Sequence, residues 1–153
     1  MVAVLVSGAS GFVAQQIVKL LVERGYTVVG TVRSREKGER LRKNLGSPRF
    51  SYEIVEDIGA AGALDETMRK HPEVTVFLHT ASPFHFSTED PENDLLLPAI
   101  NGTRNALAST IKYAPQIERV VITSSYAAVF NPERELDPNY VITEKSWNET
   151  KYE

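Results

Sequence analysis

Hydrophobic residues along the chain fall into two kinds of stretch that follow each other in turn. Short runs rich in β-branched and aromatic residues predict strands at residues 2–7, 26–32, 50–55, 74–79 and 119–123. Longer stretches of helical character lie between them, at residues 12–24, 36–45, 61–70 and 91–113. Strands that alternate with helices in this way predict an α/β fold, a doubly wound parallel sheet with helices on both faces.

Two of the later elements carry additional signals. The strand at 74–79 is nearly all apolar, as expected for a strand that is covered on both faces. The helix at 91–113 contains Pro98, which we expect to bend it. It also contains Asn101, a poor helix former for which we expect a packing or polar-bridging role. Residues 131–153 are polar, and we predict mostly loop there.

Small residues connect the first strand to the first helix. Gly8 and Gly11 lie three apart, and Ala14 follows three residues later. A glycine in the turn permits a backbone conformation that a Cβ would forbid, and a second one removes a side chain where a pyrophosphate would approach the helix N-terminus. Ala14 lets the helix pack closely on the strand. Because a strand precedes this spacing and a helix follows it, we predict a dinucleotide-binding turn rather than a purely structural one.

Positive charge follows the second strand. Proteins that bind NAD usually carry an acidic residue at this position, which accepts hydrogen bonds from the ribose hydroxyls. Here the strand ends at Arg33, and Lys37 follows one helical turn later. A guanidinium binds a 2′-phosphate through paired, charge-assisted hydrogen bonds, so we predict a preference for NADP(H). The alternative is that these cations belong to the solvated start of a helix.

The ends of the next two strands supply further candidates, because ligands of parallel sheets bind beyond the carboxyl ends of the strands. Asp57 follows the third strand, where it would meet the adenine amino group while Ile58 covers the ring. A role for this acid as an N-cap or loop residue is an equal alternative. The fourth strand leads into Thr80, Ala81 and Ser82, small residues at the point where the ligand crevice opens.

Aromatic and hydroxyl side chains come later in the sequence. Phe84 and Phe86 lie on the loop beyond the fourth strand, where they would wall an apolar substrate pocket or simply cover the surface. The fifth strand ends in Ser124 and Ser125, which would face the same crevice.

Composition excludes several classes of function. The chain has 153 residues, of which 42% are apolar and 24% charged, as expected for one globular domain. A net charge of −3 disfavours non-specific nucleic-acid binding. The sequence has no cysteine, and its histidines lack the spacing of metal ligands, so we expect no metal and a packed role for His79. Without a signal peptide or a bilayer-spanning run, we expect a cytoplasmic protein with no membrane partner.

Three motifs together resemble those of the extended short-chain dehydrogenase/reductases. They are the Gly8-x-x-Gly11-x-x-Ala14 turn, the segment LHTASPF at 78–84 and the segment TSSYAAV at 123–129. Within that family the sequence is similar to the fungal NADPH-dependent aldehyde and ketone reductases, and more distantly to plant dihydroflavonol reductases. The resemblance covers essentially the whole chain. It implies a Rossmann fold, NADP(H) as the cofactor and a small aldehyde or ketone as the substrate.

The resemblance also implies roles for individual residues. Ser125 would hydrogen-bond the substrate carbonyl oxygen, with Ser124 as the weaker candidate, and Phe84 and Tyr126 would face the substrate. Residues 7–13 would cradle the pyrophosphate, and residues 80–82 would lie along the nicotinamide ribose. The implied cofactor-binding residues are Ser7, Gly8, Ser10, Gly11, Phe12, Val13, Arg33, Lys37, Asp57, Ile58, Thr80, Ala81 and Ser82.

One part of the family pattern does not occur in the chain. The proton donor of the family is a tyrosine with a lysine four positions later, and the sequence contains no Tyr-x-x-x-Lys. We therefore expect residues 1–153 to be an NADP-binding domain that stops before this pair and before the substrate-binding domain, and to be inactive by itself. Two alternatives are a non-catalytic nucleotide-binding or sensor module and a sugar-nucleotide epimerase or dehydratase. Arg33 disfavours the second, because those enzymes tend to retain NAD.

Overall fold

A computed structural model of the chain describes residues 2–82, 88–134 and 137–150. Contacts within the chain divide it into two units, Met1–Ile122 and Thr123–Glu153. The first unit contains a five-stranded sheet in the order β3-β2-β1-β4-β5, and all neighbouring strands are parallel. Its strands are β1 (Ala3–Ser7), β2 (Thr27–Val32), β3 (Phe50–Ile54), β4 (Val74–His79) and β5 (Arg119–Ile122). The strand order reverses at β1, so β1 and its neighbours form the switch point at which ligands of such sheets bind.

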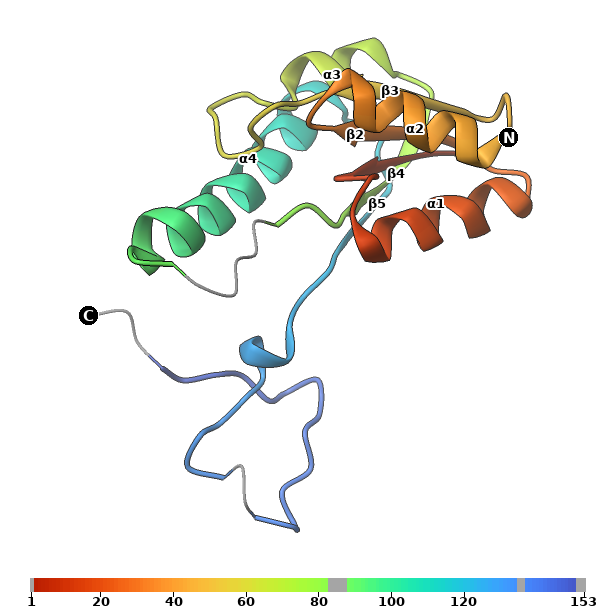
Figure 1. Ribbon diagram of the computed structural model, residues 1–153. Coiled ribbons are helices and arrows are strands. Elements are labelled where there is room, and N and C mark those ends of the chain that lie inside the picture. The colour runs from red at the N-terminus through yellow and green to blue at the C-terminus, as the bar shows by residue number, and fades with distance from the viewer. Residues whose placement is uncertain (1, 83–87, 135–136, 151–153) are drawn as a thin grey trace. The chain divides into compact units, whose positions relative to one another are not determined.

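Helices cover both faces of the sheet, which confirms the predicted doubly wound fold (Figure 1). On one face, Val18 and Leu41 join a buried cluster with Val4 and Val6 of β1. On the other face, Met68 and Ala106 pack with Leu5 and Phe77. The helices are α1 (Phe12–Glu23), α2 (Arg35–Leu45), α3 (Asp65–Lys70) and α4 (Leu97–Tyr113).

Two helical segments differ at their start from the sequence pattern. Residues 61–64 form turns, so α3 starts at Asp65. Residues Glu92–Leu96 form a π-helical turn, η1, and α4 starts at Leu97 with Pro98 in its first turn. The helical backbone is continuous across this point, because residue 91 is already helical and the Leu97 N–H donates to the Glu92 carbonyl of η1. Pro98 therefore lies within the predicted helical segment, just after the backbone changes from π-helical to α-helical geometry.

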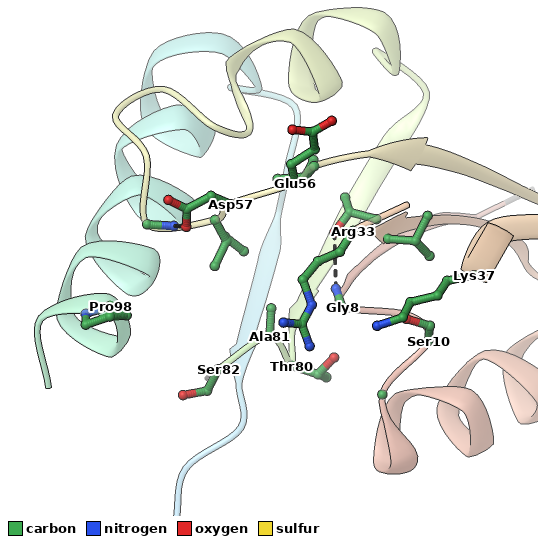
Figure 2. Close-up of a pocket in the computed structure, with 16 residues that line it drawn as sticks. Gly8, Ser10, Arg33, Lys37, Glu56, Asp57, Thr80, Ala81, Ser82 and Pro98 are labelled. Atoms are coloured by element: carbon green, nitrogen blue, oxygen red, sulfur yellow. Dashed lines mark hydrogen bonds between the residues drawn. The ribbon is translucent and has the colours of Figure 1, made fainter. Parts of the chain in front are cut away.

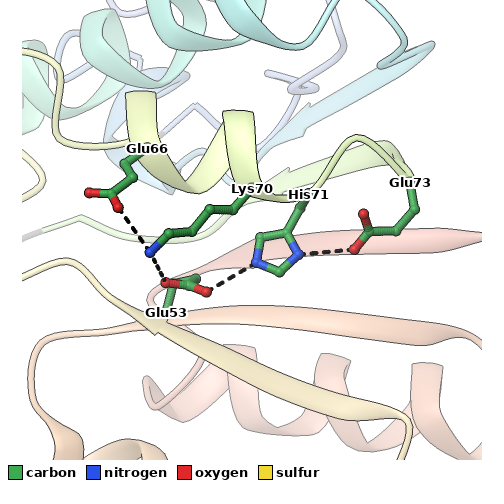
Figure 3. A network of polar contacts seen from close by, with 5 residues as sticks. All are labelled: Glu53, Glu66, Lys70, His71 and Glu73. Carbon is green, nitrogen blue, oxygen red and sulfur yellow. Dashed lines mark hydrogen bonds and ion pairs between the residues drawn. The ribbon is translucent and has the colours of Figure 1, made fainter.

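A network of polar side chains ties α3 to β3 (Figure 3). Lys70 Nζ lies 3.0 Å from a Glu66 oxygen and 3.4 Å from a Glu53 oxygen on β3. The His71 ring lies 3.2 Å from Glu53 and 2.9 Å from Glu73. The hydrogen bond with Glu66 raises the pKa of Lys70, and the same bond lowers the pKa of the Glu66 carboxyl. We assign this network to the anchoring of α3.

The described residues of the second unit form turns and one short 3₁₀ helix, η2 (Tyr126–Ala128). The Asn148 amide donates to the Ala127 carbonyl at 2.9 Å, and its backbone N–H donates to the Ala128 carbonyl at 2.8 Å. Residues 131–134 and 137–150 contain turns but no helix or strand, as predicted for this part of the chain. Across the described part of the chain, no helix combines the length and the apolar character that crossing a membrane requires.

Candidate functional site

The turn after β1 has the backbone that its glycines predicted. Gly8 has φ +66°, in the left-handed region that favours glycine. A Cβ at this position would lie 3.0 Å from the Cβ of Ala81, which follows β4. The N–H of Gly11 donates to the Gly8 carbonyl at 2.8 Å and closes the turn. Glycine at position 8 therefore allows both the turn and the close approach of two strand ends.

The N-terminus of α1 offers its N–H groups to an anion. Gly11 precedes the helix, no side chain caps this end, and the first turn contains no acidic residue. The free N–H groups and the positive end of the helix dipole suit a pyrophosphate. Phe12 and Val13 are exposed here, with relative accessibilities of 91% and 58%, because the buried side of α1 is centred on Ala14 and Val18.

Thr31, near the end of β2, fixes the position of the glycine turn. The Gly8 N–H donates to the Thr31 hydroxyl at 3.1 Å, and the Ala9 N–H donates to the Thr31 carbonyl at 2.8 Å. The sequence pattern assigned Thr31 to a strand and gave no sign of this second role. These two hydrogen bonds, both accepted by the buried Thr31, hold the turn in a single position relative to β2.

Ser7 joins the ends of β1 and β4. Its buried hydroxyl accepts hydrogen bonds from the backbone N–H groups of Thr80 at 3.0 Å and Ala81 at 3.1 Å, and lies 2.9 Å from Nδ1 of His79. The Thr80 hydroxyl in turn donates to the Ser7 carbonyl. Since Ser7 Oγ accepts from two donors, its own proton points to His79, and Nδ1 of the ring is the acceptor.

His79 is buried, as the sequence predicted for a packed histidine. Burial lowers the pKa of its imidazole, which favours the neutral ring. A neutral ring that accepts at Nδ1 carries its proton on Nε2. The Ser7–His79 pair is therefore a structural connection beneath the crevice, and the Ser7 side chain does not line the pocket.

One pocket of about 330 Å³ opens at the carboxyl ends of the parallel strands (Figure 2). It brings together the glycine turn, the end of β2, the segment after β3 and the segment after β4. The lining residues are Gly8, Ser10, Gly11, Thr31, Val32, Arg33, Lys37, Val55, Glu56, Asp57, Ile58, Gly59, Thr80, Ala81, Ser82 and Pro98. Ten of them are among the predicted cofactor-binding residues, drawn from four separate segments of the chain.

The two predicted cations lie together on one side of this pocket. Figure 2 shows the side chains of Arg33, after β2, and Lys37, on α2, reaching toward the glycine turn. Ser34 caps α2 by accepting a hydrogen bond from the Lys37 N–H at 3.4 Å, which places Lys37 in the first turn of the helix. A pair of cations beside an open helix N-terminus is a suitable site for phosphate groups.

Asp57 lines the opposite part of the pocket and also stabilises its own loop. Its Oδ1 accepts a hydrogen bond from the Gly59 N–H at 2.8 Å, and its carbonyl accepts from the Ala60 N–H. Both of the roles that the sequence left open are therefore compatible, because this bond uses one carboxylate oxygen and the residue still faces the pocket. Ile58 is half-buried next to it.

The polar bridge expected from Asn101 is made by a different residue of the same helix. Asn101 is exposed, whereas Asn105, one turn later, donates to backbone carbonyls of the loop after β3. The expectation for Asn101 was wrong because the side of α4 that faces the loop contains Gly102 and Asn105. Sequence spacing alone did not fix which side this is.

The predicted residues of the substrate site are Phe84, Phe86, Ser125 and Tyr126. Phe84 and Phe86 are outside the described residues. Ser125 belongs to the second unit, where its hydroxyl accepts a hydrogen bond from the Ala127 N–H at 3.3 Å and caps η2. Tyr126 is exposed, and its ring centroid lies 5.4 Å from that of Phe130. The roles of Ser125 and Tyr126 in a reaction stay predictions.

The parallel sheet, the glycine turn and the pocket at the strand ends together define a Rossmann-like dinucleotide-binding protein. The chain belongs to the 3-beta hydroxysteroid dehydrogenase/isomerase family, whose model matches residues 5–147. This membership agrees with the resemblance to short-chain dehydrogenase/reductases that the motifs indicated.

Curated and solved proteins with similar sequences include fungal reductases. A putative NADPH-dependent methylglyoxal reductase of Candida albicans is 57% identical over 155 residues, and the match covers 98% of this chain and 46% of that protein. The NADPH-dependent methylglyoxal reductase of Saccharomyces cerevisiae is 49% identical, with 99% and 45% covered. The crystal structure of Gre2 from Candida albicans in complex with NADPH has a TM-score of 0.95 at 52% identity, with 99% and 45% covered. The chain thus spans less than half the length of these relatives.

Proposed function

We propose that this chain is the cofactor-binding part of an NADPH-dependent carbonyl reductase that acts on a small aldehyde or ketone. The observation that carries the proposal is the pocket in which the glycine turn, Arg33, Lys37 and the segment 80–82 meet. Its residues fit the chemical groups of NADPH: open helix N–H groups for the pyrophosphate, two cations for the 2′-phosphate and a carboxylate for the adenine amino group. When bound, NADPH supplies a hydride to the substrate carbonyl.

The chain's own residues would have distinct tasks in this function. The glycine turn, fixed by Thr31, would hold the pyrophosphate, and Thr80 to Ser82 would lie along the nicotinamide ribose. Ser125 would donate a hydrogen bond to the carbonyl oxygen and so stabilise the charge that develops there. We assign the proton donor to a part of the whole protein beyond residues 1–153, and propose that these residues form its NADP-binding domain.

Relatives support the reaction class. The similar proteins of Candida albicans and Saccharomyces cerevisiae carry the names of NADPH-dependent methylglyoxal reductases, so methylglyoxal is the first substrate to test. The proposal further places the enzyme in the cytoplasm, in line with a sequence that contains no cysteine. Cell fractionation checks the location.

The test replaces a cation by an acid in the full-length protein. Arg33→Glu puts a carboxylate where the 2′-phosphate would bind, so we expect the Kd for NADPH to rise by about a hundredfold while the Kd for NADH changes by less than about threefold. Arg35→Glu is the matched control, because Arg35 is exposed, makes the same change of charge and does not line the pocket.

Two measurements complete the experiment. Fluorescence titration gives both dissociation constants, and the loss of NADPH absorbance with a panel of aldehydes and ketones gives the activity. Equal losses for NADPH and NADH in Arg33→Glu, or equal effects of both substitutions, would overturn the assignment of the 2′-phosphate. A wild-type protein that binds NADPH but oxidises it with none of the carbonyl compounds would instead support the non-catalytic alternative.

A further inference from the structure

The side-chain amide of Asn105 on α4 faces three consecutive backbone carbonyls. Its Nδ2 lies 3.1 Å from the Ile58 oxygen, 2.9 Å from the Gly59 oxygen and 2.8 Å from the Ala60 oxygen. Carbonyl oxygens accept hydrogen bonds and never donate them, so the nitrogen of the amide, rather than its oxygen, must face this loop. Two amide protons shared among three acceptors hold the loop from one side.

The loop that Asn105 holds is a wall of the cofactor pocket. Asp57, Ile58 and Gly59 all line that pocket. The bond from the Gly59 N–H to Asp57 Oδ1 at 2.8 Å fixes the carboxylate relative to the backbone. The second carboxylate oxygen is then the acceptor that the loop offers to a ligand. Its position depends on residues 58–60, and therefore on Asn105.

The same side of α4 approaches the loop one turn earlier as well, at Gly102. A Cβ on Gly102 would lie 3.2 Å from Cγ2 of Ile58, so the helix and the loop approach closely there. Pro98, four residues earlier, lines the pocket itself. Pro98, Gly102 and Asn105 are spaced four and three apart, which places them on one face of the helix. Asn105 is the member of this face that forms hydrogen bonds with the loop.

We propose that Asn105 is a positioning residue for recognition of the adenine base. This inference rests on the proposed function, because it concerns the adenine end of the bound dinucleotide. The adenine amino group is a donor that suits the second oxygen of Asp57, whereas hypoxanthine presents a carbonyl oxygen at the same position. By holding residues 58–60, Asn105 keeps Asp57 where it favours adenine over hypoxanthine.

The test is the substitution Asn105→Asp in the full-length protein. It preserves the shape of the side chain but replaces the donor by a carboxylate that repels the three carbonyls. Asn101→Asp is the matched control, since Asn101 is an exposed asparagine of the same helix. The probes are NADPH and its hypoxanthine analogue, reduced nicotinamide hypoxanthine dinucleotide phosphate, and fluorescence titration gives the Kd of each.

We expect Asn105→Asp to raise the Kd for NADPH by about tenfold and the Kd for the analogue by about twofold or less, so that discrimination between the bases decreases. Asn101→Asp should leave both values within about twofold of wild type. If Asn105→Asp does not fold, Asn105→Ala allows the same comparison of the two changes in Kd without the added charge. Equal changes for both dinucleotides, or none, would overturn the inference. A wild-type protein that binds neither dinucleotide would overturn the proposed function instead.

Discussion

Replacing Ser7 by alanine tests the connection between β1 and β4. The Ser7 hydroxyl accepts from two backbone N–H groups and lies 2.9 Å from Nδ1 of His79. Ser7→Ala removes one oxygen atom and therefore three hydrogen bonds at the same time. The Thr80 and Ala81 N–H groups lose their acceptor, and the ring nitrogen of His79 loses its donor.

The expected loss of stability follows from the burial of these groups. A polar group left unpaired in the interior costs about 1–3 kcal/mol. Thr80 and Ala81 are half-buried, so water partly replaces their lost acceptor, whereas His79 is buried. Taking about 1 kcal/mol for each of the three groups, we expect Ser7→Ala to reduce the free energy of unfolding by about 3 kcal/mol.

Urea denaturation followed by circular dichroism measures this free energy. Ser10→Ala is the matched control, because Ser10 lies in the same turn and uses its backbone carbonyl, rather than its hydroxyl, to accept from Gln15 at 2.9 Å. We expect the control to change the free energy of unfolding by less than about 0.5 kcal/mol. A loss below about 1 kcal/mol for Ser7→Ala, or equal losses for both variants, would refute the reasoning.

Two further predictions concern buried positions. Burial holds the pKa of His79 below its ordinary value of 6.5, so the unfolded chain binds more protons and the free energy of unfolding should fall as the pH falls below about 6.5. His79→Asn keeps an acceptor for Ser7 but cannot titrate. The free energy of unfolding, measured by denaturation at several pH values, should therefore depend less steeply on pH. An unchanged dependence would rule out His79 as its cause. Gly30→Ala would place a Cβ 2.6 Å from that of Ala9, which should cost about 1–3 kcal/mol in thermal unfolding. The control is Gly46→Ala, because Gly46 has φ +57° and a Cβ there would have no atom within 4 Å. We expect this control to cost about 1 kcal/mol from its backbone conformation alone. A Gly30 variant no less stable than the control would contradict the packing argument.

The sequence by itself determined the architecture and most of the pocket. Alternating strand and helix patterns are local properties, and parallel strands bring their carboxyl ends to one edge wherever the helices lie. Residues placed just after a strand, such as Arg33, Asp57 and Thr80, therefore reached the pocket as predicted. The φ of Gly8 was predictable for the same reason, because a tight turn restricts its own backbone.

Only the tertiary structure decided which side chains hold the pocket walls in place. Ser7 has its partners 72 to 74 residues away, and Asn105 has its partners 45 to 47 residues away. A hydroxyl at a strand end and an amide inside a helix carry no local sign of such distant acceptors and donors. The sequence therefore contained no indication of the bonds of Ser7, and it assigned the polar bridge to Asn101. Packing of the helices on the sheet fixed which atoms came within hydrogen-bonding distance, and this depends on the whole chain.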